Sequence, residues 1–306
     1  MTTNLHYSVM LPESVQSLEL QPGLTVVDCT VNRAGHAVEI AKTIGPKGTL
    51  VMFDLDRTAL REAKERLEKE VSKLPRLHFI HSNYRNIKSE LEKVGINKVD
   101  RIFADLGLSS QELEISGRGF TFQKDEPLYM TFNSEVDRNT FTAADLINNL
   151  SSANLEKIFQ VYGDEPKSWK IANAIVEERE KLSERNKRIE TTGELVEIIE
   201  RVTGYVKGKS KTHPATRIFQ AIRIAVNDEY EGIKDLIKDG FDALNEKGIM
   251  SIITFHSGED RIVKKMFKEL CNGETQNEEV KQKPSKDEIK ENRRSRSALL
   301  RTIKKN

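Results

Sequence analysis

The sequence is poor in cysteine and contains no long apolar run. Only Cys29 and Cys271 are cysteines among its 306 residues, and two cysteines this far apart predict neither a disulfide framework nor a zinc site. No segment approaches the ~20 consecutive apolar residues of a membrane-spanning helix. The N-terminal residues lack the basic and apolar regions of a secretory signal. We therefore expect a cytoplasmic protein with no metal cluster and no membrane partner.

The chain is instead rich in charge. Charged residues make up 32% and hydrophobic residues 37% of the sequence, as in a globular protein of one large domain or two modest ones. The net charge is only +1, but residues 281–306 contain ten Lys or Arg against three acidic residues. A second basic stretch contains Lys207, Lys209, Lys211 and Arg217. Such clusters attract phosphate backbones, although solvated surface is the more common explanation on charge alone.

Four strand-like segments in the first third of the chain each end at or beside a polar residue. These strands are expected at Leu24–Asp28, Thr49–Phe53, Leu77–His81 and Val99–Ala104. The segments between them have helical patterns, and the clearest is Thr58–Val71, whose apolar residues form one stripe. Alternating strands and helices predict a parallel sheet whose strand ends share one ligand-binding edge.

From about residue 107 to residue 213 helical patterns continue without strand alternation. A capping box, Thr191-x-x-Glu194, opens one of these helices, and the others are expected at Ala143–Gln160 and Trp169–Leu182. A long helical stretch follows over 215–244, with Gly232 and Gly240 as candidate breaks. The last two strands are expected at Ile249–Phe255 and Ala298–Ile303. The sequence therefore predicts an α/β protein with an inserted all-helical domain.

Three aspartates, Asp28, Asp54 and Asp105, mark the ends of predicted strands. Asp54 falls about 20 residues after the first loop, where an acidic residue binds the ribose hydroxyls of an adenosine-containing cofactor. A single strand-end aspartate is commonly a helix cap or a turn former, but three at one edge favour a nucleoside site. Tyr84 follows the third strand, where its ring either stacks on adenine or belongs to the edge of the core.

The loop after the first strand, Asn32–His36, contains a single glycine, Gly35. A dinucleotide site requires G-x-G-x-x-G so that the backbone can approach a pyrophosphate. A P-loop lysine motif is also absent, which argues against nucleotide hydrolysis. A cofactor without a pyrophosphate, such as S-adenosylmethionine, fits this loop better. His36, like His256 after a later strand, is either a base or a hydrogen-bonding and capping residue.

Several motifs occur in an order that spans nearly the whole chain. The longest are HPATR-x-FQA-x-RI-x-VN at 213–227 and FHS-x-EDRIVK at 255–264. Shorter ones are D-x-T at 28–30, D-x-D at 54–56, DLG-x-SS at 105–110 and RGFTF at 118–122. Together they resemble the bacterial small-subunit (16S) ribosomal RNA cytosine-N4 methyltransferases.

The resemblance implies a class I, Rossmann-like methyltransferase fold with a mostly parallel sheet, formed by residues 1–107 and 214–306, and an inserted helical substrate-recognition domain at 108–213. It implies S-adenosylmethionine as cofactor, small-subunit ribosomal RNA or the 30S particle as partner, and methylation at N4 of a decoding-region cytidine. The family's cofactor-contacting positions fall on Ala34, Gly35, His36, Asp54, Tyr84, Asp105 and Glu112.

Asp105 is the candidate catalytic residue, because a strand-end carboxylate can accept a hydrogen from the N4 amino group and so aim its lone pair. The target cytidine must also leave its base stack. A non-catalytic homologue that binds ribosomal RNA is the alternative. The sequence does not indicate whether the protein is a monomer or an oligomer.

The sequence departs from the family pattern at some of these positions. Asn32 and Ala34 stand where glycine is usual, and Glu112 stands where glutamine is usual. Asn32 tolerates a positive φ, whereas Ala34 adds a methyl group beside the expected cofactor contacts. Tyr129 and Thr131 replace an acidic residue and an arginine. We therefore expect cofactor binding that survives but is weakened, and altered or absent activity if the pair at 129 and 131 shapes the target pocket.

Overall fold

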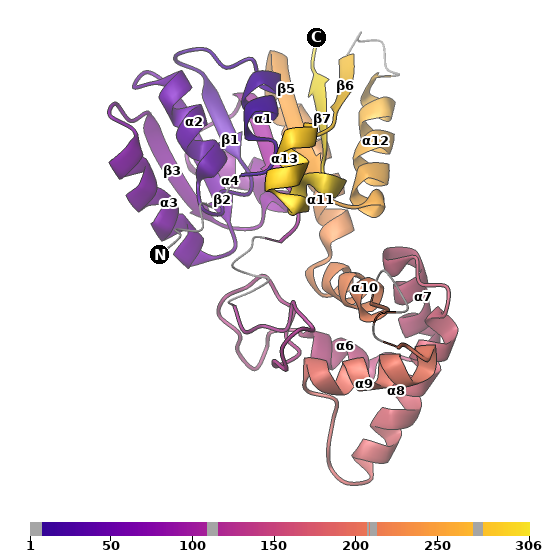
Figure 1. Ribbon diagram of the computed structural model, residues 1–306. Coiled ribbons are helices and arrows are strands. Elements are labelled where there is room, and N and C mark those ends of the chain that lie inside the picture. Colours follow the sequence, from indigo (N-terminus) through magenta and orange to yellow (C-terminus); the bar gives the residue numbers. More distant parts are fainter. Residues whose placement is uncertain (1–7, 109–115, 207, 209–212, 272–277) are drawn as a thin grey trace. The chain divides into compact units, whose positions relative to one another are not determined.

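The computed structural model describes residues 8–108, 116–206, 208, 213–271 and 278–306. The chain divides into two compact units (Figure 1). The first, here called the sheet unit, consists of Met1–Gly107 and Tyr230–Asn306, and the second, the helical unit, consists of Leu108–Glu229. Among the described residues, no helix is long and apolar enough to cross a membrane.

The sheet unit contains a seven-stranded sheet in the order β3-β2-β1-β4-β5-β7-β6. Only β7 runs opposite to the other strands. This mostly parallel arrangement confirms the predicted Rossmann-like methyltransferase fold. The strands are β1 (Thr25–Asp28), β2 (Thr49–Asp54), β3 (Arg76–His81), β4 (Val99–Asp105), β5 (Leu244–Thr254), β6 (Glu278–Gln282) and β7 (Leu299–Lys304).

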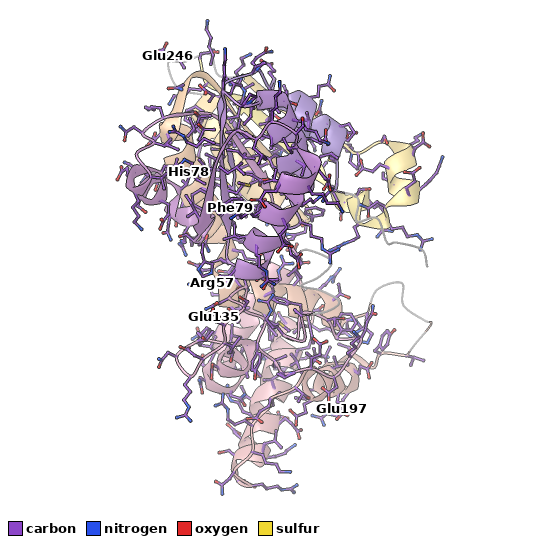
Figure 2. All side chains as sticks on the ribbon, turned by 90° about the vertical axis from the view of Figure 1, so that its left-hand side faces the viewer. Arg57, His78, Phe79, Glu135, Glu197 and Glu246 are labelled. Carbon is purple, nitrogen blue, oxygen red and sulfur yellow. The ribbon has the colours of Figure 1, made fainter. Side chains whose placement is uncertain are left out.

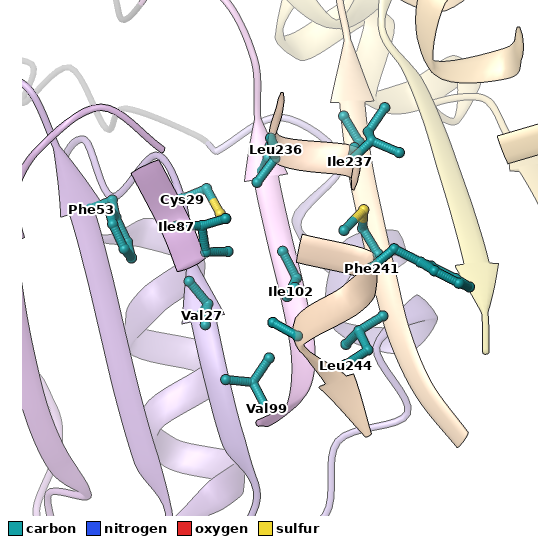
Figure 3. Close-up of a cluster of buried hydrophobic side chains, with 14 of the residues drawn as sticks. Val27, Cys29, Phe53, Ile87, Val99, Ile102, Leu236, Ile237, Phe241 and Leu244 are labelled. Carbon is teal, nitrogen blue, oxygen red and sulfur yellow. The ribbon is translucent and has the colours of Figure 1, made fainter. Parts of the chain in front are cut away.

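Both faces of the sheet are covered by helices, because successive strand residues point to opposite faces. Val27 and Phe53 pack on one face against the helices that carry Ile87 and Leu236 (Figure 3). The neighbouring strand residues pack on the other face against α1, α2 and α3. The helices of this unit are α1 (Leu11–Ser17), α2 (Gly35–Ile44), α3 (Arg57–Glu70), η1 (Tyr84–Asn86), α4 (Ile87–Lys93), α11 (Glu229–Ala243), α12 (Ser257–Cys271), α13 (Lys286–Glu291) and η2 (Arg293–Ser297).

The helical unit has a hydrophobic core of its own. Its helices are α6 (Ala143–Asn149), α7 (Ser152–Gly163), α8 (Ser168–Ser183), α9 (Thr192–Thr203) and α10 (Ala215–Asn227). The capping box of Thr191 and Glu194 opens α9 as predicted. The single helix expected over 143–160 is instead α6 and α7, because the Ser151 side chain caps a new helix by accepting from the Asn154 N–H.

The second boundary between the units lies after residue 229, not after residue 213 as the sequence predicted. Helix α10 belongs to the helical unit because Ile218, Phe219 and Ile222 are buried in that unit's core. The helical stretch predicted over 215–244 is broken at Asp228, which adopts a left-handed conformation with φ 49° and separates α10 from α11. Gly232, a predicted break, lies inside α11 instead. The break between the two helices therefore lies at Asp228, and not at Gly232 or Gly240.

Candidate active site

The carboxyl ends of the parallel strands β2, β1 and β4 bring the three strand-end aspartates to one edge of the sheet unit. β2 ends at Asp54, β1 at Asp28 and β4 at Asp105, and β1 lies between the other two. Figure 2 marks both ends of this unit, with Arg57 directly after the carboxyl end of β2 and Glu246 near the start of β5. The edge predicted from the strand pattern is therefore present.

The loop after β1 is tied to the end of β2 by Asp54. Its Oδ2 accepts the Asn32 backbone N–H at 2.9 Å, and its Oδ1 accepts the Asp56 N–H at 2.9 Å. A carboxylate oxygen can accept more than one hydrogen bond, and binding of ribose hydroxyls by Asp54 stays a prediction. Asn32 and Ala34 have φ of 44° and 58°, which is the backbone conformation that glycine adopts most readily.

The side chain of Ala34 is fully buried and belongs to the hydrophobic cluster beneath α2. A place for this methyl group among the cofactor contacts stays a prediction. The cost of alanine here is conformational, because an L-residue in the left-handed region is strained by about 1–2 kcal/mol.

Gly35 begins α2 at a point where the N-terminal segment passes very close. A Cβ at this position would lie 1.8 Å from the Ser8 Oγ. A larger residue at this position would require the Ser8 hydroxyl to turn away, so glycine is the residue that fits the observed approach without a shift. The carbonyl of Arg33 also accepts from Arg66 at 2.8 Å, which fixes the loop to α3.

His36 is buried and joins α2 to the N-terminal segment. Its Nε2 lies 3.1 Å from the Val9 carbonyl oxygen. A carbonyl can only accept, so Nε2 carries the proton and Nδ1 carries a lone pair. Nδ1 lies 4.0 Å from Oδ2 of Asp105. Burial lowers the pKa of His36 to about 4, so this residue is a neutral hydrogen-bonding group at pH 7.

Asp105 is the least satisfied polar side chain of this edge. Its backbone N–H donates to the Thr30 hydroxyl at 2.7 Å, and the Thr30 N–H donates to Asp28 Oδ1 at 3.1 Å. Its Oδ1 is buried without a hydrogen-bond partner among the described residues. Burial, with smaller contributions from Asp28 and Glu259, raises the pKa of Asp105 to about 8, against the opposing charge of Arg294.

Asp28 is a second buried carboxyl beside it. Burial raises the pKa of Asp28 to about 7, although the Thr30 N–H works in the opposite direction. Perturbed carboxyls in a strand-end setting are typical of functional sites. The sequence identified Asp28 as a strand-end residue but gave it no role, because a raised pKa depends on burial that only the fold creates.

Tyr84 begins η1 directly after β3 and is half-buried. Its ring lies 3.5 Å from where a Cβ of Gly232 would be, an ordinary van der Waals distance, so the ring packs close to α11. Tyr84 packs against the core, and a role on adenine stays a prediction. Glu112, the remaining predicted cofactor residue, lies outside the described residues.

The FHS-x-ED motif caps α12 at the end of β5. Glu259 is buried, and its Oε2 accepts the Phe255 N–H at 2.7 Å while its Oε1 lies 3.0 Å from Nε2 of His256. His256 is therefore held as a capping residue, one of the two roles that the sequence left open. Gly258 completes the turn, because a Cβ there would lie 1.7 Å from the Tyr230 hydroxyl.

Comparison with known proteins places this geometry in a family. The sequence profile of the MraW methylase family matches residues 3–306. The chain belongs to this family. It is 43% identical to ribosomal RNA small subunit methyltransferase H of Clostridioides difficile, over 98% of both chains. It is 38% identical to the protein of the same name from Brevibacillus brevis, again over 98% of both chains. A solved rRNA methylase from Streptococcus thermophilus matches 96% of this chain and 94% of that chain at 9% identity, with a TM-score of 0.42.

Membership of the MraW methylase family confirms the resemblance drawn from the motifs. In the helical unit, two of these motifs have a structural role. Arg118 of RGFTF donates to the carbonyls of Thr131 and Phe132 at 3.0 and 2.8 Å. Asn227, the last residue of the HPATR-to-VN motif, donates to the Met130 carbonyl at 2.8 Å. These contacts hold the stretch that departs from the family pattern at Tyr129 and Thr131.

Within the described residues, no group of three His, Cys, Asp or Glu is arranged to hold a metal ion. The polar groups at this edge of the sheet are carboxyls, backbone N–H groups and a tyrosine. They suit a nucleoside-containing cofactor.

Proposed function

We propose that this chain is a cytoplasmic enzyme that transfers a methyl group from S-adenosylmethionine to N4 of a cytidine in small-subunit ribosomal RNA. The observation that carries the proposal is the 43% identity over 98% of both chains to ribosomal RNA small subunit methyltransferase H. The strand-end carboxyls Asp54 and Asp105 support it, because they lie where a methyltransferase of this fold needs polar groups.

The edge of the sheet unit has the donors and acceptors that the cofactor requires. Asp54 is the strand-end carboxylate in the position expected for binding ribose hydroxyls, and the loop of Ala34, Gly35 and His36 offers backbone at the start of α2. Asp105 presents a buried oxygen without a partner among the described residues. The cofactor, when bound, supplies a methyl group on a positively charged sulfur. A positive charge nearby favours the ionised form of a buried carboxyl.

The same carboxyl serves the reacting amine. Asp105 accepts a hydrogen bond from the N4 amino group, which turns the nitrogen lone pair out of conjugation with the ring. Once N4 has received the methyl group that the cofactor would supply, N4 becomes acidic, and Asp105 would take its proton. His36 keeps Nδ1 unprotonated beside Asp105, since its Nε2–H is committed to Val9. The helical unit, in this proposal, recognises the RNA substrate.

Purified protein incubated with methyl-labelled S-adenosylmethionine and unmethylated small subunits, or free 16S ribosomal RNA, tests the proposal. The expected product is label in N4-methylcytidine after digestion to nucleosides. Cofactor binding without transfer would support a non-catalytic RNA-binding homologue. Label in another nucleoside or in protein would show a different substrate.

A further inference from the structure

The segment between β6 and β7 lies at the same edge of the sheet as Asp105. Because β7 is antiparallel, its first residue, Leu299, pairs with Thr254, the last residue of β5. The last residue of β6, Gln282, pairs with Leu300. Asp105 is opposite Ile253 of β5, which in turn is opposite Leu300. The connection 283–298 therefore leaves and re-enters the sheet at the edge that carries the candidate active site.

This segment is held in place by specific contacts. The Met10 N–H donates to Glu288 of α13 at 2.8 Å, next to Val9, whose carbonyl binds His36 (Figure 1). Ser285 caps α13, and the Asn292 side chain caps η2. Ser295 is fully buried in η2. The charge of Arg294 lowers the pKa of Asp105, so η2 lies within electrostatic reach of the candidate catalytic carboxyl.

Exposed cations without acidic partners gather on this segment and at the adjoining end of β6. None of them forms an ion pair with another residue in the described ranges; they are Lys281, Lys283, Lys286, Arg293 and Arg296, here called the basic edge. Exposed lysines such as Lys47 and Lys73 are also unpaired within the described residues, but they lie at the other end of the strands. The basic edge is therefore distinguished by its place beside the strand end that carries Asp105.

We propose that the basic edge binds the phosphate backbone of the substrate RNA next to the target nucleotide. The inference rests on the proposed function and deepens it by assigning the surface that positions the RNA at Asp105. Exposed Lys and Arg bind phosphates by displacing counterions, which gives affinity and orientation without reading sequence. A base that has left its stack still has phosphates on both sides, so a basic surface beside the catalytic carboxyl is placed to hold them.

The test compares two multiple variants of the full chain. The first is Lys283→Gln, Arg293→Gln and Arg296→Gln together. The matched control is Lys47→Gln with Lys73→Gln, because both lysines are exposed and precede β2 and β3 at the opposite end of these strands. Binding of an unmethylated small-subunit ribosomal RNA transcript is measured by fluorescence anisotropy over a range of salt concentrations. Calorimetry with S-adenosylmethionine reports whether the cofactor site remains intact.

For the basic-edge variant we expect about a tenfold or greater loss of RNA affinity at low salt. The slope of log K against log salt concentration should be shallower by about two to three, because each lost phosphate contact removes about one from this slope. The control should keep the wild-type slope, and both should bind cofactor normally. Equal slopes for the two variants would overturn the assignment of the surface. Wild-type protein that binds and methylates no ribosomal RNA would instead contradict the proposed function itself.

Discussion

Buried polar groups are present in both units, but they are satisfied in one and not in the other. In the helical unit, Arg223 and Glu229 form a bidentate pair at 2.7 and 2.9 Å, and Arg118 binds two carbonyls. At the edge of the sheet unit, Asp28 is buried and Asp105 is half-buried, yet neither forms an ion pair with a Lys or Arg of the described residues and their pKa values are raised. The comparison separates polar groups that build the fold from those kept for a ligand.

The largest expected effect comes from Asp105→Asn. An amide cannot take the N4 proton, so we expect methyl transfer to fall by about 100-fold or more. The variant should fold at least as stably as the wild type at pH 8, because it removes a carboxyl that is costly to ionise in this site. Labelled transfer and thermal unfolding measure the two. A variant with the normal transfer rate would remove Asp105 from the mechanism.

Glu229→Gln in the helical unit should reduce the stability of the fold, in contrast to Asp105→Asn. It leaves the guanidinium of Arg223 buried without its charged partner, and such a loss costs about 3–5 kcal/mol. The control is Glu231→Gln, since Glu231 pairs with Lys234 on an exposed surface, where a pair contributes about 0–1 kcal/mol. Urea unfolding followed by circular dichroism measures both. Equal losses of unfolding free energy in the two variants would show that the Arg223–Glu229 pair does not stabilise the fold as a buried polar group.

Stability should also depend on pH through the edge of the sheet. Asp28 and Asp105 have raised pKa values of about 7 and 8, so the folded state keeps protons that the unfolded state has released. Their contribution therefore decreases as the pH rises from about 4 to about 8, by up to about 1.4 kcal/mol per pH unit for each group. His36, with its pKa lowered to about 4, acts oppositely and loses stability as the pH falls below its ordinary value of 6.5.

The window from pH 6.5 to 8 is governed mainly by the carboxyls, because His36 is neutral in the folded state and at least half neutral in the unfolded state. Wild-type protein should lose stability across this window, and Asp105→Asn should lose less. Denaturant unfolding at four or five pH values gives the difference. A wild type and a variant with parallel pH profiles would show that Asp105 is not buried with a raised pKa in solution.

The edge of the sheet was predictable because strand patterns are local. Each of the first four strands ended where its apolar run met a polar residue, which located Asp54 and Asp105 correctly. The missed strand β6 has a single apolar residue, Val280, and exists through its pairing with β7. The break at Asp228 comes from a left-handed backbone conformation that the helical pattern of 215–244 did not indicate.

The side-chain environment and the pKa values of the site residues were less predictable than their positions. Both left-handed residues of the loop after β1 were visible as departures from glycine, but the burial of the Ala34 side chain was not. The raised pKa values of Asp28 and Asp105 arise from burial by segments far away in sequence. The link from η2 to the candidate active site required the antiparallel register of β7.

The smallest expected effect is that of Ala34→Gly. Glycine relieves the left-handed strain of about 1–2 kcal/mol. Against this, the variant gives up a buried methyl, worth about 0.8 kcal/mol, and increases the entropy of the unfolded chain by about 0.4–1 kcal/mol. The net change in stability should therefore be within about 1 kcal/mol. Since the Ala34 side chain is buried in a hydrophobic cluster, affinity for S-adenosylmethionine by calorimetry should change by less than about threefold, which is under 1 kcal/mol. A tenfold gain would mean that the methyl group obstructs the cofactor after all, and the loop would then be a weakened binding site rather than a strained but competent one.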